Sequence, residues 1–160
     1  MTLKKLAGAL MAVGLGAAAF GAHAQVSGDK VKIGYITDLS GLYADIDGQG
    51  GVEAVKMAIE DAGGKVLGKP IELVTADHQN KADIAASKAR EWMDQQGLDM
   101  LLGGTNSATG LAMNKVASEK KRVFIDIGAG TARLTNEECT PYTIHYAYDT
   151  VALAKGTGSA

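Results

Sequence analysis

The chain has 160 residues, of which 46% are hydrophobic and 21% are charged, and its formal net charge is −2. No cluster of basic residues is interleaved with aromatic residues, which excludes a nucleic-acid-binding surface. The densest basic run is Lys120-Lys121-Arg122. Such a run is typical of a solvent-facing helix C-terminus, where the helix dipole favours cations. We therefore expect no nucleic-acid partner.

The N-terminus has the pattern of an export signal. Lys4 and Lys5 precede an apolar run over residues 6–20, and Ala22-His23-Ala24 supplies the small-x-small cleavage pattern. A membrane-spanning helix needs roughly 20 residues, more than this run provides. A buried N-terminal helix is the alternative, but a run without a polar face fits export better. We predict a signal peptide over residues 1–24, cleaved after Ala24, and a periplasmic location.

The remaining 136 residues carry 14 basic and 18 acidic side chains, a net charge of −4, and can form one domain with a core. Cys139 is the only cysteine, so no disulfide can form within the chain. It is either a buried small hydrophobe or a surface residue that pairs with a cysteine beyond this chain. Its neighbours Glu137, Glu138 and Pro141 favour a surface loop. Both alternatives stay open.

Hydrophobic periodicity predicts alternating strands and helices along the rest of the chain. In chain order we expect a strand at 31–37, a helix at 49–62, a strand at 71–76, a helix at 81–96, a strand at 99–102, a helix at 108–120, strands at 122–127 and 143–148, and a helix that begins at Thr150 after an Asp149 cap. Such alternation is typical of βαβ units. The predicted fold class is α/β, with an open, mostly parallel sheet and helices on both faces.

Ligands of parallel sheets bind beyond the carboxyl ends of the strands, here the loops at 38–43, 77–80, 103–109 and 128–131. Gly103-Gly104 allows a close backbone approach, and the helix that follows offers free N–H groups. Hydroxyls of Thr105 and Ser107 add donors, so a carboxylate could bind without Lys or Arg. Alternatively, Asn106 or Ser107 only caps the helix, and local spacing favours this second interpretation.

Two further loops carry weaker signals. Gly128-Ala129-Gly130-Thr131 could present backbone amides to a ligand or form an ordinary turn. Asp77 and His78 could form a metal or acid–base pair, but no third ligand lies near them in sequence, and a hydrogen-bonded loop fits better. We expect neither a metal nor a cofactor.

Catalytic motifs are missing from the sequence. Ser107 lacks the surrounding Gly-x-Ser-x-Gly elbow, and neither the dinucleotide-binding Gly-x-Gly-x-x-Gly nor the phosphate-binding Gly-x-x-x-x-Gly-Lys-Thr motif is present. We therefore expect a binding protein rather than an enzyme, with no catalytic residues.

An ordered set of motifs resembles a known family. Residues 32–43, Lys-Ile-Gly-Tyr-Ile-Thr-Asp-Leu-Ser-Gly-Leu-Tyr, are similar to the opening strand and Ser-Gly-Pro loop of the leucine/isoleucine/valine-type periplasmic binding proteins of ABC uptake systems. The pattern continues at 51–54, 58–64, 77–80, 102–109 and 146–149, over essentially the whole mature chain. The resemblance implies a type I periplasmic binding fold, in which two lobes close on a ligand and inner-membrane permease subunits receive it. Residues 25–148 would form most of the first lobe, and 149–160 would begin the crossover to a second lobe in a longer protein.

The resemblance also implies roles for individual residues. The loop of Ser107 and Ala108 would bind the ligand carboxylate through a hydroxyl and backbone amides, which favours ligand contact over capping alone for Ser107. The loop at 128–131 would complete the polar clamp, and the Tyr43 region would cover the ligand. The complete predicted ligand-binding set is Tyr43, Thr105, Ser107, Ala108, Gly128, Ala129, Gly130 and Thr131.

The sequence departs from the amino-acid binders of this family at three points. Leu42 replaces the usual Pro, Gly130 stands where a Thr helps to hold the polar head, and Asn106 lies near the position of a missing disulfide cysteine. These differences favour an aromatic or other organic carboxylate, with an amino acid as the alternative. We expect a monomeric transport receptor. A ligand-sensing receptor of the same fold, or an exported hydrolase that uses Ser107, are the competing functions.

Overall fold

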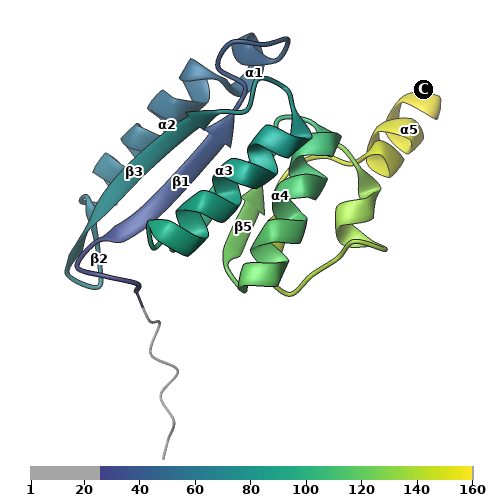
Figure 1. Ribbon diagram of the computed structural model, residues 1–160. Helices are drawn as coiled ribbons and strands as arrows, with labels where there is room; N and C mark the ends of the chain where they lie inside the picture. Colours follow the sequence, from purple (N-terminus) through teal and green to yellow (C-terminus); the bar gives the residue numbers. More distant parts are fainter. Residues whose placement is uncertain (1–25, 160) are drawn as a thin grey trace, which may run out of the picture.

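The computed structural model describes residues 26–159 of the chain (Figure 1). The predicted signal peptide and its cleavage after Ala24 lie outside the described residues. Within 26–159, no helix combines the length and the apolar character needed to cross a membrane.

A six-stranded sheet forms the centre of the fold, in the order β2-β3-β1-β4-β5-β6. Its pairs are parallel except for the short β2, which runs antiparallel to β3. The strands are β1 (Val31–Thr37), β2 (Lys65–Val66), β3 (Lys69–Asp77), β4 (Met100–Gly103), β5 (Val123–Asp126) and β6 (Thr143–His145). The carboxyl ends of the parallel strands therefore meet at one edge of the sheet.

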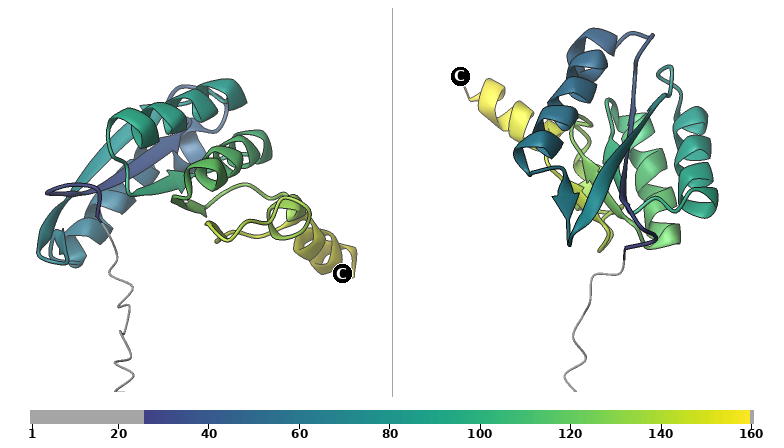
Figure 2. Two further views of the ribbon diagram at one scale, coloured as in Figure 1. Left: turned by 60° about the horizontal axis from the view of Figure 1, so that its bottom comes forward. Right: turned by 90° about the vertical axis from the view of Figure 1, so that its left-hand side faces the viewer.

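Helices cover both faces of this sheet. They are α1 (Ala44–Asp47), α2 (Gln49–Asp61), α3 (Ala82–Gln95), α4 (Ser107–Lys120), the 3-10 helix η1 (Ala132–Thr135) and α5 (Thr150–Gly158). Figure 1 and Figure 2 show α3 and α4 side by side on one face and α2 on the other. The predicted α/β class, with a mostly parallel open sheet and helices on both faces, is confirmed.

The main core lies between the central strands and the pair α3 and α4. Ile36, Leu101 and Phe124 point from the strands and are fully buried against Trp92 and Met113 of the helices. Burial of each large apolar side chain stabilises the fold by roughly 1.5–3 kcal/mol. Gly34 permits this close packing, since a Cβ atom there would lie 2.7 Å from Cε3 of Trp92.

Two strands, β3 and β6, differ most from their predicted ranges. The strand β3 begins at Lys69 rather than at residue 71, because Lys69 and Pro70 pair with β2 before the pairing with β1 starts at Ile71. The strand β6 ends at His145 rather than at residue 148, because its partner β5 ends at Asp126. The chain beyond His145 is therefore free to turn over the carboxyl edge.

Several local features lie outside the predicted pattern. The short helices α1 and η1 and the strand β2 were not predicted. Lys121 ends α4 with φ of 53°, a left-handed conformation that is uncommon for a lysine. Cys139 is exposed in the loop after η1, so it is not a buried hydrophobe.

Candidate ligand-binding site

A cavity of about 420 Å³ lies at the carboxyl edge of the sheet, beside the N-terminal end of α4. Six of the predicted binding residues line it: Tyr43, Thr105, Ser107, Ala108, Gly128 and Gly130. Four residues that were not predicted complete the lining: Asn106, Tyr148, Thr150 and Leu153. None of these ten side chains carries a charge, so any charged ligand group must be met here by neutral donors and dipoles.

Asn106 is the N-cap of α4. Its Oδ1 accepts hydrogen bonds from Ala108 N at 2.9 Å and from Thr109 N at 3.1 Å. The Thr109 hydroxyl lies 3.4 Å from Asn106 N, which completes a capping box. Ser107 is half-buried, and its hydroxyl makes no hydrogen bond to the residues that the structure describes. Of the two residues that could cap the helix, Asn106 does so, and the Ser107 hydroxyl is left for the cavity.

Asp126 holds the loop that forms one wall of the cavity. Its carboxylate is fully buried at the end of β5, and Oδ1 accepts hydrogen bonds from Ala129 N at 2.9 Å and from Gly128 N at 3.3 Å. Burial raises the pKa of Asp126 to about 7. His145 Nε2 donates to the carbonyl of Ala129 at 2.5 Å, so both backbone groups of Ala129 are hydrogen-bonded.

Two predicted residues of this loop do not line the cavity. Ala129 is fully buried behind the wall. The hydroxyl of Thr131 accepts a hydrogen bond from Arg133 N at 3.3 Å and caps η1 instead. A direct ligand contact of either residue stays a prediction.

Thr105 turns its hydroxyl away from the open cavity. Only 7% of the residue is exposed, and its Oγ1 lies 3.2 Å from both Thr37 Oγ1 and His78 Nε2. His78 is fully buried and hydrogen-bonded within its loop. Residues 26–159 contain no group of three or more His, Cys, Asp or Glu side chains that could hold a metal ion.

Two tyrosines flank the cavity, and each is placed by a specific contact. Asp38 is fully buried and accepts hydrogen bonds from Gly41 N at 2.7 Å and Tyr43 N at 3.0 Å, which fixes the loop before α1. The ring of Tyr148 lies against Gly130. The sequence signal that could have found Tyr148 is an exposed aromatic residue directly after a short strand at the carboxyl edge.

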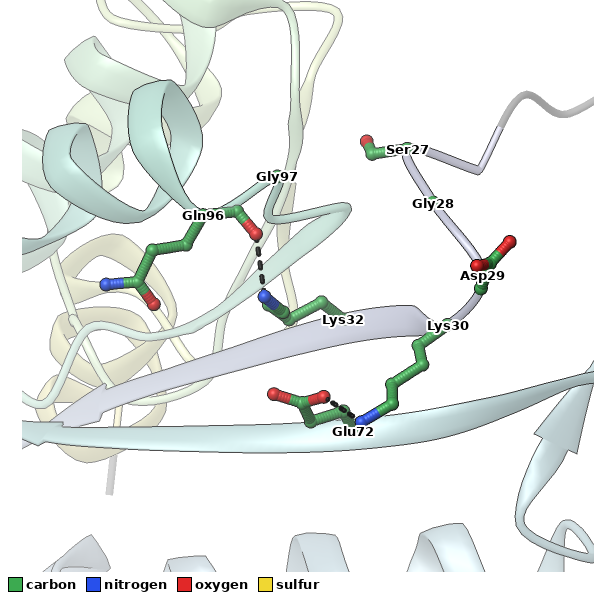
Figure 3. A pocket seen from close by; sticks show the side chains of 8 residues that line it. All are labelled: Ser27, Gly28, Asp29, Lys30, Lys32, Glu72, Gln96 and Gly97. Atoms are coloured by element: carbon green, nitrogen blue, oxygen red, sulfur yellow. Dashed lines mark hydrogen bonds and ion pairs between the residues drawn. The ribbon is translucent and has the colours of Figure 1, made fainter.

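Other hollows offer less to a polar ligand. A cavity of about 290 Å³ at the opposite edge contains Lys30 and Lys32, shown in Figure 3. Both lysines are engaged, since Lys30 Nζ lies 2.8 Å from Glu72 and Lys32 Nζ donates to the carbonyl of Gln96 at 2.7 Å. A groove of about 400 Å³ between α2 and the sheet is lined only by glycine and apolar residues. The cavity beside α4 is therefore the candidate site.

The family of the chain is shown by comparison with known proteins. A family model described as periplasmic binding protein matches residues 30–160. The chain belongs to this family. A search of the curated proteins finds no match to the chain.

Solved structures of such proteins share the fold and part of the sequence. A periplasmic binding protein from Burkholderia mallei is 79% identical with a TM-score of 0.80, over 82% of this chain and 35% of that one. A branched-chain amino acid ABC transporter periplasmic ligand-binding protein from Burkholderia xenovorans is 41% identical with a TM-score of 0.73, over 81% and 36%.

A third structure was solved with a ligand. It is a solute binding protein of an ABC transporter from Rhodopseudomonas palustris in complex with 3,4-dihydroxy benzoic acid. It is 27% identical with a TM-score of 0.70, over 76% of this chain and 33% of that one. The chain thus spans about a third of the length of each of these structures.

Proposed function

We propose that this chain forms the first lobe of the solute-binding component of an ABC uptake system, and that a small carboxylate-bearing solute binds between this lobe and a second one. The observation that carries the proposal is the cavity beside α4, where the Ser107 hydroxyl lies at the positive end of the helix dipole and has no hydrogen-bond partner among residues 26–159. Membership of the periplasmic binding protein family supports the same function.

The cavity favours an aromatic or other organic acid over an α-amino acid. Tyr43 and Tyr148 offer aromatic rings to an aromatic ligand, and the N-terminal end of α4 offers neutral donors to its carboxylate. None of the described residues that line the cavity carries a carboxylate, so an α-ammonium group would have no ion-pair partner in this lobe. The Rhodopseudomonas palustris relative with 3,4-dihydroxy benzoic acid supports the aromatic class. The Burkholderia xenovorans relative keeps an amino acid as the alternative.

The compartment and partners follow from the same proposal. The protein would act in the periplasm after cleavage behind Ala24, as a monomer, and deliver its solute to permease subunits in the inner membrane. Residues 149–160 would begin the crossover to the second lobe. They include α5, whose N-terminus is capped by Asp149 through Ala152 N.

A hydrolase that uses Ser107 is disfavoured by the two histidines of the described chain. His78 Nε2 is bonded to Thr105, and His145 Nε2 is bonded to the carbonyl of Ala129. Neither imidazole is bonded to Ser107, where a general base would be needed. A ligand-sensing receptor of the same fold remains the competing function, and transport assays with the permease would separate the two.

A thermal-shift screen of the two-lobed protein tests the ligand class. It would compare benzoate, 3,4-dihydroxybenzoate, leucine and short aliphatic acids. A ligand at 100 times its dissociation constant stabilises the folded state by about 2.7 kcal/mol. We expect the aromatic acids to raise the transition temperature and leucine to leave it unchanged. A shift with leucine alone would contradict the aromatic class, and no shift with any carboxylate would contradict the proposed function.

A further inference from the structure

His78 lies behind the candidate site and has no contact with the cavity. It follows directly after β3, is fully buried, and its backbone N–H donates to the carbonyl of Thr37 at 2.9 Å. Its imidazole lies between the end of β3 and the loop before α4, and both ring nitrogens have partners. A buried imidazole with two specific partners is held in one orientation.

The partner of Nδ1 fixes the tautomer of His78. Asn80 N–H lies 2.9 Å from Nδ1, and because a backbone N–H can only donate, Nδ1 must carry the lone pair. Burial lowers the pKa of His78, which keeps the ring neutral. The proton of the neutral ring is then on Nε2, which donates to Thr105 Oγ1 at 3.2 Å.

The next two hydroxyls of this chain are oriented by the same reasoning. Thr37 Oγ1 lies 2.9 Å from Asp47 Oδ1 and 3.3 Å from the carbonyl of Asp47, both of which only accept. Thr37 must donate to Asp47, so at its 3.2 Å contact with Thr105 it accepts. The hydrogen bonds therefore run in one direction from His78 to Asp47, and the Thr105 proton points inward rather than to a ligand.

A second arm leads from His78 to the cap of α4. Asn80, whose N–H is bound by the imidazole, also accepts a hydrogen bond through Oδ1 from Asn106 Nδ2. Asn106 Oδ1 in turn binds the first amides of α4. Gln79 and Asn80 have φ of 52° and 56°, a left-handed pair that costs free energy and needs such contacts to persist.

We infer that His78 is a positioning residue for the ligand site, which in its neutral Nε2–H form fixes Thr105 directly and Asn106 through Asn80. The inference rests on the proposed function for the identity of the site. The inference also changes the predicted role of Thr105. Its backbone shapes the cavity, but its hydroxyl donates a hydrogen bond to Thr37 and not to a ligand. The donor for a carboxylate in this loop is Ser107.

Three substitutions at residue 78 separate the two arms. H78N retains an acceptor near the Nδ1 position, H78Q retains a donor near the Nε2 position, and H78F removes both while it keeps a flat ring. In the two-lobed protein we expect H78F to weaken binding of 3,4-dihydroxybenzoate by about tenfold, the effect of one lost hydrogen bond or somewhat more. The affinities of H78N and of H78Q for the same ligand should each fall by a smaller factor. Equal affinity of H78F and wild type would overturn the inference.

A measurement on the wild type keeps the inference testable if H78F does not fold. The ¹⁵N NMR signals of the imidazole distinguish the neutral tautomers, and we expect the Nε2–H form at pH 7. An Nδ1–H form or a charged ring would overturn the inference. If the wild type binds no carboxylate, the proposed function fails, and the inference is decided by the backbone amide signals of Asn106, Ala108 and Thr109. These shift in H78F if His78 positions the end of α4 and stay in place if it does not.

Discussion

The ring of Tyr148 lies directly against Gly130, so that a Cβ atom at residue 130 would stand 3.2 Å from Cε2 of the ring. Both residues line the cavity beside α4, and 59% of Tyr148 is exposed. A side chain at residue 130 would therefore crowd the Tyr148 ring. The resemblance to amino-acid binders places a Thr at this position, and the glycine leaves room for the ring.

A larger side chain at residue 130 should displace Tyr148 and weaken ligand binding. We expect G130V to reduce the affinity for 3,4-dihydroxybenzoate by about tenfold, which corresponds to about 1.4 kcal/mol and lies within the usual cost of overpacking. Titration calorimetry of the two-lobed protein measures this. The control is G156A, at a position in α5 where a Cβ atom meets nothing within 4 Å. Unchanged affinity in G130V would show that the ring does not border the ligand.

Removal of the α4 cap should lower stability. N106A leaves the amides of Ala108 and Thr109 without their acceptor, and loss of an N-cap typically costs about 1 kcal/mol. We expect the free energy of unfolding, measured in urea, to fall by about that amount. S107A should leave it unchanged, because its hydroxyl has no partner among the described residues. If S107A lost more stability than N106A, Ser107 rather than Asn106 would be the residue that caps α4.

Gly104 is required by both its conformation and its neighbour. Its φ is 91°, and a Cβ atom there would overlap Oδ2 of the buried Asp126. We expect G104A to destabilise the fold by at least about 1–2 kcal/mol, the cost of a left-handed backbone with a side chain. G50A is the matched control, since Gly50 lies in α2 with nothing within 4 Å of an added Cβ. Because Gly50 is in the first turn of α2, G50A should leave the free energy of unfolding unchanged or raise it by less than about 1 kcal/mol. A neutral G104A would contradict the close contact with Asp126.

Asp126 should make stability depend on pH. Its folded pKa of about 7 lies above the ordinary value of 3.8, so the folded state retains a proton that the unfolded state has lost. The stabilisation that this proton provides is complete below pH 3.8 and is lost as the pH rises through about 7. His145, whose Nε2 lies 4.0 Å from Oδ1, lowers the pKa of Asp126 and so opposes the effect of burial.

The D126N variant isolates this contribution. An amide at residue 126 can still accept from Ala129 N but does not titrate. Between pH 4 and 8, we expect the free energy of unfolding of D126N to decline less with rising pH than that of the wild type. Chemical denaturation at several pH values measures both curves. Parallel curves would mean that Asp126 is ionised in the fold throughout this range.

The architecture could be predicted from the sequence because apolar residues recur at the spacing of the buried face of each helix and strand. The parallel strands and the helices α2, α3 and α4 follow from apolar spacing, within one or two residues at most ends. The strand at 143–148 was predicted too long, since Tyr146 and Tyr148 suit a strand locally but β5 offers no partner beyond Asp126. Edge pairing of β2 with β3 was missed because two residues carry no periodic signal.

The sequence could predict which loops form the site, but not which hydrogen bonds their side chains make. Glycine-rich segments after the strands indicated the loops around Ser107 and Gly130, which do line the cavity. The direction of the Thr105 hydroxyl depends on His78 and Thr37, which lie 27 and 68 residues away in sequence. Local spacing cannot contain such a long-range relationship. The choice between Asn106 and Ser107 as the cap also needed the actual hydrogen bonds.

The affinity of S107A for a carboxylate and for its uncharged amide tests the central claim most directly. Hydrogen bonds to charged groups contribute about 1.5–3 kcal/mol. In the two-lobed protein we expect S107A to bind 3,4-dihydroxybenzoate at least about tenfold more weakly than the wild type does. The affinity for the corresponding amide should fall much less. The free energy of unfolding of S107A should equal that of the wild type. If S107A binds the acid as tightly as the wild type does, the carboxylate does not bind at the N-terminal end of α4.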